Sequence, residues 1–436
     1  MVPATRPGDL RRLLPASAPD AAEPFDTILG DFREQIVPGM THWGHPGWFA
    51  YFPANSSPPS VLGEVLAAGL GAQCMSWETS PAATELEQTV MSWYRQLLDL
   101  PDAFTGVIQD TASSATLVAF LTARERAGGD PSRLVAYWSA EAHSSVSKAA
   151  RLAGIPASRH RVVPVDAAFA MRPAALADMM AADATAGLVP AIVVATMGTT
   201  SSTACDPLRA IGEVAAARNA WYHIDAAFGG SAAIVPELRP LLDGVELADS
   251  MVTNPHKWLL TNVHCSSYFV RDTSALIRTF GATAEYLRTR HDADDATVNF
   301  RDWGIPLGRR FNALKLWFVL RSYGADALRE MIRQHIRWGH ELAGWVDETP
   351  GFERLAPAPL ALVCLRHVPD AMVGDEPALA AHNAALMARV NATGRVHLTH
   401  TNLGGKYAIR VAIGGFRTEQ RHVEDVWRLL REESAR

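Results

Sequence analysis

Three residues with chemically versatile side chains stand at the ends of apolar stretches. Lys257 lies in Asn254-Pro255-His256-Lys257-Trp258, after an extended run at 248–253. Asp225 ends the apolar run 221–224, and His143 follows another apolar run. A lysine amine can form a Schiff base with an aldehyde, a buried carboxylate demands a cationic partner, and an imidazole can lie flat on a ring. Together these groups could hold an aldehyde cofactor that has a basic ring nitrogen.

Pyridoxal phosphate has both features. Lys257 would bond to its aldehyde, and Asp225 would keep the pyridine nitrogen protonated, so that the ring can draw in electrons. Each residue also has a simpler interpretation, since most lysines are surface charges and a lone histidine is often a hydrogen-bonded core residue. The combination of all three at the ends of apolar runs favours the cofactor.

A phosphate group needs a site of its own. Thr111-Ala112-Ser113-Ser114 directly precedes the helical stretch 115–127. Its hydroxyls and the free N–H groups of the first turn would converge on an anion at the positive end of the helix dipole. The same residues could instead serve only as a helix cap.

Aromatic residues and histidines gather between residues 41 and 55. They are His42, Trp43, His45, Trp48, Phe49, Tyr51 and Phe52. Core packing is one interpretation of such a cluster. Pro46, Gly47 and Pro53 favour a loop, and rings presented by a loop can form an apolar slot for a flat ligand.

Taken in order, these motifs resemble those of the group II pyridoxal-phosphate decarboxylases, and among them the aromatic-L-amino-acid decarboxylases. The resemblance runs from about Pro7 to the C-terminus. Its motifs are His45-Pro46, Phe49-Ala50-Tyr51-Phe52-Pro53, Ser80-Pro81, His143-Ser144-Ser145, Asp225-Ala226-Ala227, Asn254-Pro255-His256-Lys257-Trp258 and Ile305-Pro306-Leu307-Gly308-Arg309-Arg310-Phe311. It implies a fold type I, aspartate aminotransferase-like large domain with pyridoxal 5'-phosphate as the cofactor. It also implies a homodimer with the active site at the subunit interface, and a chain that begins after a further helix found in relatives.

The resemblance further implies roles for individual residues. His143 would stack on the pyridine ring, and Thr200 would lie near it. The phosphate would be bound by Thr111, Ala112 and Ser113, with help from Asn254 and His256. The substrate side chain would contact Trp48, Phe49, Tyr51, Phe52, Pro53, Met75, Trp77 and Gly308. This slot has no lysine or arginine, which favours an aromatic amino acid over an acidic one.

The segment 279–299 bears on the type of reaction. It has little periodicity, and long loops in compact domains are often lids over active sites. Within it, Tyr286 matches the lid tyrosine that returns a proton to the substrate α-carbon in decarboxylases, and in this family the lid comes from the neighbouring subunit. Relatives that form aldehydes by oxidative deamination often have phenylalanine there, and a phenyl ring cannot act as a general acid. Tyr286 therefore favours decarboxylation to the amine.

The expected substrates are tryptophan, 5-hydroxytryptophan, dihydroxyphenylalanine, tyrosine or phenylalanine. Gly308, where relatives carry glycine or serine, leaves room for an indole ring. The alternatives are an aromatic aldehyde synthase of the same fold and, more distantly, a catalytically silent binding protein that retains the cofactor fold.

Composition excludes several other classes of protein. The net charge of −6 and the lack of a basic block interleaved with aromatics argue against a nucleic-acid partner. Four scattered cysteines, Cys74, Cys205, Cys265 and Cys364, suggest neither a metal site nor a disulfide framework. We expect them to be buried thiols in a reducing cytoplasm. No secretory signal or membrane span is expected.

With 436 residues, the chain should form more than one substructure. Helical stretches alternate with short apolar runs at 134–138, 191–196, 221–225 and 250–254, which predicts an α/β domain with a mostly parallel sheet. We expect an N-terminal segment at 1–60 with a helix near 25–36 that contacts the partner subunit. The large cofactor-binding domain should span 61–315, and a small α+β domain should span 316–436.

Overall fold

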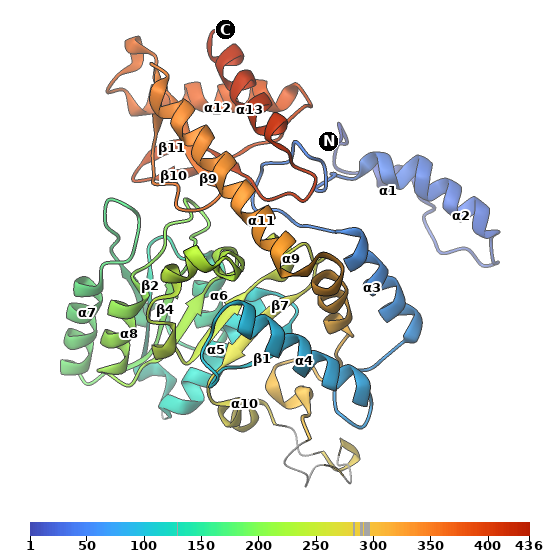
Figure 1. Ribbon diagram of the computed structural model, residues 1–436, viewed down its shortest axis with the longest axis vertical. Coiled ribbons are helices and arrows are strands. Elements are labelled where there is room, and N and C mark those ends of the chain that lie inside the picture. Colours follow the sequence, from blue (N-terminus) through green and yellow to red (C-terminus); the bar gives the residue numbers. More distant parts are fainter. Residues whose placement is uncertain (129, 282–283, 288–290, 292–296) are drawn as a thin grey trace.

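A seven-stranded sheet forms the centre of the molecule. The computed structural model describes residues 1–436 except 129, 282–283, 288–290 and 292–296 (Figure 1). From edge to edge, the strands are β1 (Thr105–Gln109), β7 (Ser266–Val270), β6 (Ser250–Thr253), β5 (Trp221–Asp225), β4 (Val189–Thr196), β2 (Leu134–Ser139) and β3 (His160–Val163). The five strands from β6 to β3 run parallel, whereas β7 runs antiparallel to both β6 and β1. The expected α/β architecture with a mostly parallel sheet is confirmed.

Helices cover both faces of this sheet. The side chains of its strands alternate between two separate apolar cores, so that neighbouring residues of one strand belong to different cores. One face packs against α5 (Ala112–Ala127), α6 (Ser144–Leu152) and α10 (Thr273–Phe280). The other packs against α4 (Pro81–Leu97), α7 (Pro173–Thr185), α8 (Leu208–Ala216) and the long α11 (Asn312–Glu348). Burial on both faces explains why the strands are continuous apolar runs in the sequence.

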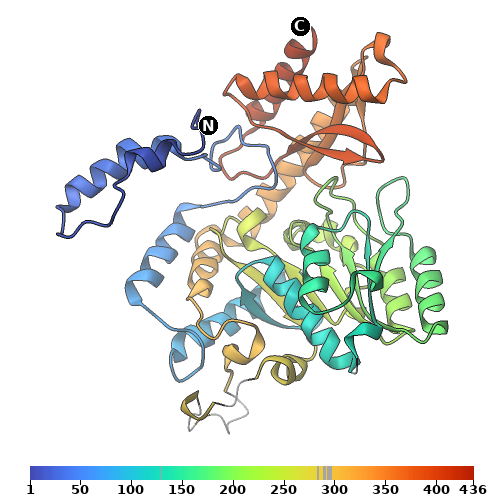
Figure 2. The ribbon, with the colours of Figure 1, turned by 180° about the vertical axis from the view of Figure 1, so that it is seen from behind.

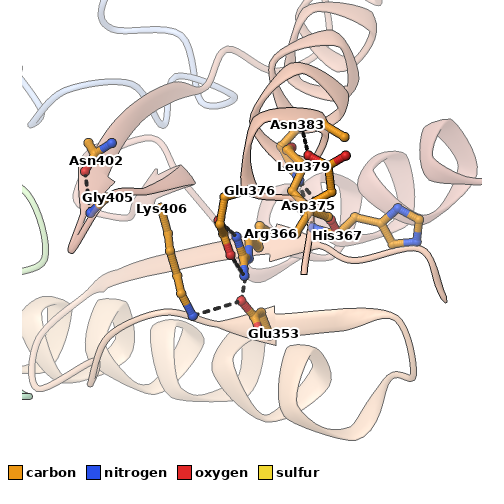
Figure 3. Close-up of polar contacts among 11 residues, drawn as sticks. Glu353, Arg366, His367, Asp375, Glu376, Leu379, Asn383, Asn402, Gly405 and Lys406 are labelled. Atoms are coloured by element: carbon orange, nitrogen blue, oxygen red, sulfur yellow. Dashed lines mark hydrogen bonds and ion pairs between the residues drawn. The ribbon is translucent and has the colours of Figure 1, made fainter. Parts of the chain in front are cut away.

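A second, antiparallel sheet follows α11. Its strand order is β10 (Thr399–Leu403), β11 (Lys406–Ala412), β9 (Leu362–His367) and β8 (Phe352–Arg354). Helices α12 (Glu376–Ala392) and α13 (Gln420–Ser434) pack with it. Arg366 on β9 is buried and forms ion pairs with Glu353 on β8 and Glu376 on α12 (Figure 3). Because both carboxylates bind one guanidinium, this contact ties the strand edge to the helix.

Helix α11 connects the two sheets. It begins at Asn312, and Gly324 interrupts its regular geometry with a positive φ of 71° and a ψ of 165°, a conformation that favours glycine. The proposed boundary at 315/316 therefore falls inside this helix, and the division into 1–60, 61–315 and 316–436 stays a prediction.

The N-terminal helices α1 (Asp9–Leu13) and α2 (Phe25–Asp31) extend away from the rest of the chain (Figures 1 and 2). Neither helix contains a buried residue, and even the large apolar side chain of Phe25 is 73% exposed. A π-helical turn, Phe32–Ile36, continues α2, so the helix expected near 25–36 is present. The next helix, α3 (Pro58–Leu70), also leaves large apolar side chains in contact with solvent.

Within the described ranges, no helix has the length and apolar character needed to cross a membrane.

Candidate active site

The carboxyl ends of the central strands surround a cavity of about 220 Å³, here called the first cavity. Ligands of open α/β sheets bind at this edge, because the strand ends present loops and helix N-termini together. Nine of its lining residues were predicted from the sequence to bind a cofactor: Thr111, Ala112, Ser113, His143, Thr200, Asp225, Asn254, His256 and Lys257. These nine residues come from five separate segments of the chain, and the first and last of them are more than 140 positions apart in the sequence.

Lys257 lies in α9 (Pro255–Trp258), a single helical turn directly after β6. Its Nζ is 5.2 Å from the centre of the Phe52 ring. Burial lowers the pKa of Lys257, Asp225 opposes this effect, and Arg410 adds to it. A lowered pKa increases the fraction of neutral amine, which is the form that attacks an aldehyde.

Asp225 is the last residue of β5 and is 4% exposed. In the described part of the chain its carboxylate accepts one hydrogen bond, from the backbone N–H of Ala227 at 3.1 Å. Thr196 pairs with Asp225 across the neighbouring strands, lines the same cavity, and has a buried hydroxyl without a partner among the described residues. Since buried polar groups need partners, both side chains suit a polar ligand in the cavity.

His143 caps α6 at the mouth of the cavity. Its Nδ1 accepts a hydrogen bond from the backbone N–H of Ser145 at 3.2 Å and lies 2.8 Å from the Ser145 hydroxyl. Burial lowers the pKa of His143, Asp225 opposes the shift, and Lys257 reinforces it. A neutral ring that accepts at Nδ1 carries its proton on Nε2.

The N-terminus of α5 forms another wall. Thr111 caps the helix by accepting a hydrogen bond from the N–H of Ser114 at 3.3 Å. The N–H groups of Ala112 and Ser113 belong to the first turn, which has no intrahelical acceptors, so they suit an anion. Thr111 is therefore a helix cap and a cavity residue at once.

Asn254 and His256 are held by their surroundings. Asn254 Oδ1 accepts a hydrogen bond from the Ser266 hydroxyl at 2.7 Å, which leaves the amide group free to donate. His256 contacts the backbone of Cys265 through Nδ1, at 2.7 Å from the carbonyl oxygen and 3.1 Å from the nitrogen. Burial lowers the pKa of His256 to about 4.

A second cavity of about 340 Å³ adjoins the first and shares Phe52, His143, Thr200 and Lys257 with it. Trp43 and Tyr51 form one wall, with ring centres 5.3 Å apart and planes at 16°. Thr399, His400 and Thr401 of β10 and Arg410 of β11 also line it. The second cavity therefore lies between the large sheet and the C-terminal sheet.

Arg410 is the one cationic residue of this wall that the sequence reasoning missed. It is 3% exposed, and burial lowers its pKa to about 10. Its Nε donates to the carbonyl oxygen of Thr200 at 2.9 Å, and its Nη1 donates to the carbonyl oxygen of Tyr51. Its Nη2 is buried without a hydrogen-bond partner in the described structure. The expectation of a slot without arginine therefore does not describe this cavity.

The predicted substrate residues divide into two groups. Tyr51 and Phe52 line the second cavity, whereas Trp48, Phe49 and Pro53 are buried and are not among its lining residues. Met75, Trp77 and Gly308 lie elsewhere and line neither cavity. Met75 and Trp77 contact the segment 299–309, to which Gly308 belongs. The Met75 carbonyl accepts a hydrogen bond from Arg301 N–H at 2.8 Å, and Trp77 N–H donates one to Asn299 Oδ1 at 3.3 Å.

Tyr286 also lies away from both cavities. It is 81% exposed in a short 3₁₀ helix, Glu285–Leu287, whose neighbours 282–283, 288–290 and 292–296 are outside the described residues. Helix α10, which precedes this short helix in the chain, lies at the end of the molecule opposite the C-terminal sheet (Figures 1 and 2). Within one chain, Tyr286 therefore does not line the cavities that contain Lys257.

Signals for some of the missed residues are present in the sequence. Arg410 interrupts the apolar run Ala408-Ile409-Arg410-Val411-Ala412, and a charge inside a buried strand needs a reason. Phe228, which also lines the first cavity, directly follows the motif Asp225-Ala226-Ala227. Nothing in the sequence links Thr399, His400 and Thr401 to Lys257, because they belong to a different sheet.

The first cavity fits pyridoxal phosphate in every part. It offers an amine for the aldehyde, a buried carboxylate with unused acceptor capacity for the pyridine nitrogen, and helix N–H groups for the phosphate. The ring of His143 lies in the same wall. Among the residues described, no group of three or more His, Cys, Asp and Glu side chains could hold a metal ion.

Comparisons with known proteins agree with this geometry. A phenylacetaldehyde synthase of Arabidopsis thaliana is 44% identical, over 99% of this chain and 90% of its own length. Tryptophan decarboxylase 2 of Oryza sativa subsp. japonica is 44% identical, over 99% of this chain and 89% of its own. The crystal structure of Oryza sativa TDC with PLP and tryptamine aligns with a TM-score of 0.97 and 39% identity, covering 100% of this chain and 92% of that one. The family model described as the pyridoxal-dependent decarboxylase conserved domain matches residues 7–368, and the chain therefore belongs to the pyridoxal-dependent decarboxylase family.

Proposed function

We propose that this protein uses pyridoxal phosphate to decarboxylate an aromatic L-amino acid to the corresponding arylalkylamine and CO₂. The observation that supports this most directly is the pair of adjoining cavities. The first has the groups that pyridoxal phosphate needs, and the second has an aromatic wall and a buried arginine. The shared wall includes Lys257, so a substrate that reacts beside Lys257 can extend into the second cavity.

Pyridoxal phosphate, when bound, supplies the electron sink for the bond that breaks to the carboxylate. Lys257 would bind the cofactor aldehyde, and Asp225 would hold the proton on its pyridine nitrogen. His143 and Thr200 would contact the ring. The first turn of α5, together with Asn254 and His256, would bind the phosphate.

The second cavity receives the substrate side chain. Trp43 and Tyr51 present an aromatic wall to a flat ring, and Thr399, His400 and Thr401 provide polar groups along another side. The unpaired Nη2 of Arg410 donates to the carboxylate of the incoming amino acid. This arrangement suits tryptophan, 5-hydroxytryptophan, dihydroxyphenylalanine, tyrosine or phenylalanine.

The active enzyme is a homodimer in which each chain completes the site of the other. The exposed large apolar residues of the N-terminal helices and of α3 support this assembly, since exposed apolar side chains that gather on a few helices are typical of protein–protein contacts. They include Phe25, Ile28 and Phe32, and then Val61, Leu62, Val65, Leu66 and Leu70. Neither cavity of a chain is lined by its own Tyr286, Met75, Trp77 or Gly308, and the dimer brings the partner's copies of these residues to the cavities. Tyr286 would then act as the acid that protonates the α-carbon.

A panel of aromatic L-amino acids tests the function. We expect CO₂ and one equivalent of amine from at least one of them, and none from glutamate. Lys257→Ala should lose turnover and the visible absorbance of lysine-bound pyridoxal phosphate. Full activity in Lys257→Ala would refute the assignment of the lysine.

The second candidate is an aromatic aldehyde synthase, which the 44% identity to a phenylacetaldehyde synthase favours. Tyr286 favours the amine, because a phenol can return a proton to carbon and a phenyl ring cannot. We expect the wild type to form amine without hydrogen peroxide, and Tyr286→Phe to shift the product toward aldehyde and peroxide. Peroxide in equal amount to CO₂ from the wild type would establish the synthase instead.

We also place the protein in the cytoplasm. The four cysteines support this, since none of them forms a disulfide.

A further inference from the structure

Four aromatic rings form a continuous row that begins in the first cavity and ends in α11. Phe52 and Phe228 lie 3.9 Å apart with planes at 13°, and Phe228 and Trp258 lie 4.4 Å apart at 7°. His335 continues the row at the edge of Trp258, nearly in the same plane, with ring centres 6.4 Å apart and planes at 9°. All four side chains are buried. We call Phe52, Phe228, Trp258 and His335 the ring column.

Both ends of the ring column carry a specific polar interaction. At the cavity end, Lys257 Nζ lies 5.2 Å and Arg410 Cζ 4.6 Å from the centre of the Phe52 ring. At the far end, the indole N–H of Trp258 donates a hydrogen bond to His335 Nδ1 at 3.0 Å. Burial lowers the pKa of His335 to about 4, so its ring is neutral near pH 7 and able to accept.

Lys257 and Trp258 are neighbours in α9, which has only four residues. One helical turn is not stable by itself, so contacts outside the turn must fix its orientation. Successive side chains of a helix point about 100° apart around its axis, and holding Trp258 therefore sets the direction of Lys257. Asn55 Nδ2 provides one further contact by donating to the Lys257 carbonyl at 2.6 Å.

We propose that His335 is a positioning residue for Lys257. It fixes the indole of Trp258, which orients the α9 turn, and the same ring column supports Phe52 under the Lys257 amine. The inference rests on the proposed function in that Lys257 is taken to bind pyridoxal phosphate. It adds a residue of α11 that touches neither cavity to the groups that determine how the lysine meets the cofactor.

Two replacements of His335 separate its roles. His335→Phe keeps a flat ring and removes the acceptor, so the buried indole N–H loses its partner. His335→Asn loses the ring and keeps an acceptor, because the amide oxygen stands at the same number of bonds from the backbone as Nδ1. Ile332→Ala, a buried residue one turn earlier in α11, is the control for general destabilisation of the helix.

The readouts are the dissociation constant of pyridoxal phosphate, from titration of the apoprotein, and the pH midpoint of the visible absorbance of the bound cofactor. We expect His335→Phe to bind the cofactor about tenfold more weakly, because the released indole no longer holds the α9 turn in the orientation that cofactor binding needs. The pH midpoint should fall by about half a unit, because a reoriented Lys257 loses its alignment with the Phe52 ring. His335→Asn and Ile332→Ala should stay near the wild type in both readouts.

A second variant covers the case in which His335→Phe does not fold. Trp258→Phe removes the donor instead of the acceptor and should weaken cofactor binding to a similar extent. Where both single variants fold, the double variant should bind more tightly than the two separate effects predict, because neither polar group is then left unpaired.

Wild-type affinity and pH midpoint in His335→Phe or in Trp258→Phe would overturn the proposal. So would equal losses in Ile332→Ala and His335→Phe, since the effect would then come from the stability of α11. A wild type that binds pyridoxal phosphate but decarboxylates no aromatic amino acid would refute only the proposed function. These readouts measure cofactor binding and remain valid in that case.

Discussion

Two variants that do not form the amine should together restore amine formation if the active site is shared between chains. The partners are Lys257→Ala, which lacks the cofactor lysine, and Tyr286→Phe, which lacks the lid acid. Tyr286 is 81% exposed and lines neither cavity of its own chain, so in this structure it does not reach the Lys257 of that chain. A twofold dimer would instead bring each Tyr286 to the cavity of its partner.

The size of the effect follows from random pairing. Equal amounts of the two chains give about half heterodimers, and each heterodimer has one site with both residues intact and one site with neither. About one quarter of all sites should therefore form amine at the wild-type rate. If both residues acted within one chain, no chain in the mixture would carry an intact pair, and the mixture would form no more amine than the average of the two variants.

Co-expression of the two chains with different affinity tags allows the heterodimer to be purified and assayed for amine. The purified heterodimer should reach about half of the wild-type rate per dimer, since one of its two sites is complete. Each homodimer assayed alone is the control. A heterodimer without amine activity above these controls, or a wild type that sediments as an active monomer, would refute the shared site.

Three further outcomes test other parts of the structure. Burial lowers the pKa of His223, His256 and His335 to about 4, against about 6.5 in an unfolded chain. The stabilisation from keeping these histidines neutral is therefore complete above pH 6.5 and lost as the pH falls toward 4. Protonation of each histidine should reduce the free energy of unfolding by about 2 kcal/mol at pH 5. Denaturant titrations at pH 7 and pH 5 measure this difference. Arg410→Gln should lower kcat/KM about tenfold to a hundredfold through the lost charged hydrogen bond, and an unchanged kcat/KM would remove Arg410 from substrate binding. Leu66→Glu should dissociate the dimer in sedimentation, whereas Leu152→Glu, at an equally exposed leucine of α6, should not.

The large sheet and the first cavity were largely predictable from the sequence. Each strand is a short apolar run, and both faces of the sheet are buried, so the runs are easy to locate. The residues after these runs had to meet, because parallel strands end at the same edge. For this reason Lys257, Asp225 and His143 could be assigned to one site before any coordinates were known.

The rest depended on contacts that local patterns do not encode. β1 pairs with β7, more than 150 residues away in the sequence. No local pattern in the sequence indicates that β7 runs antiparallel to its neighbours. Arg410 reaches the second cavity from β11, whose position relative to β5 is set by α11 and by packing between the sheets. Motif resemblance assigned Met75, Trp77 and Gly308 to substrate binding, but they line neither cavity of this chain, so their role stays a prediction.

The two cavities draw on different parts of the protein, and this has a consequence for how such an enzyme can diversify. The residues proposed to hold the cofactor come from loops of the large sheet, whereas part of the substrate wall comes from the β10–β11 hairpin. Substitutions at Thr399, His400 or Thr401 can alter which ring is accepted while the bond-breaking apparatus stays as it is. New substrates can therefore be acquired in small evolutionary steps, without intermediates that no longer bind pyridoxal phosphate.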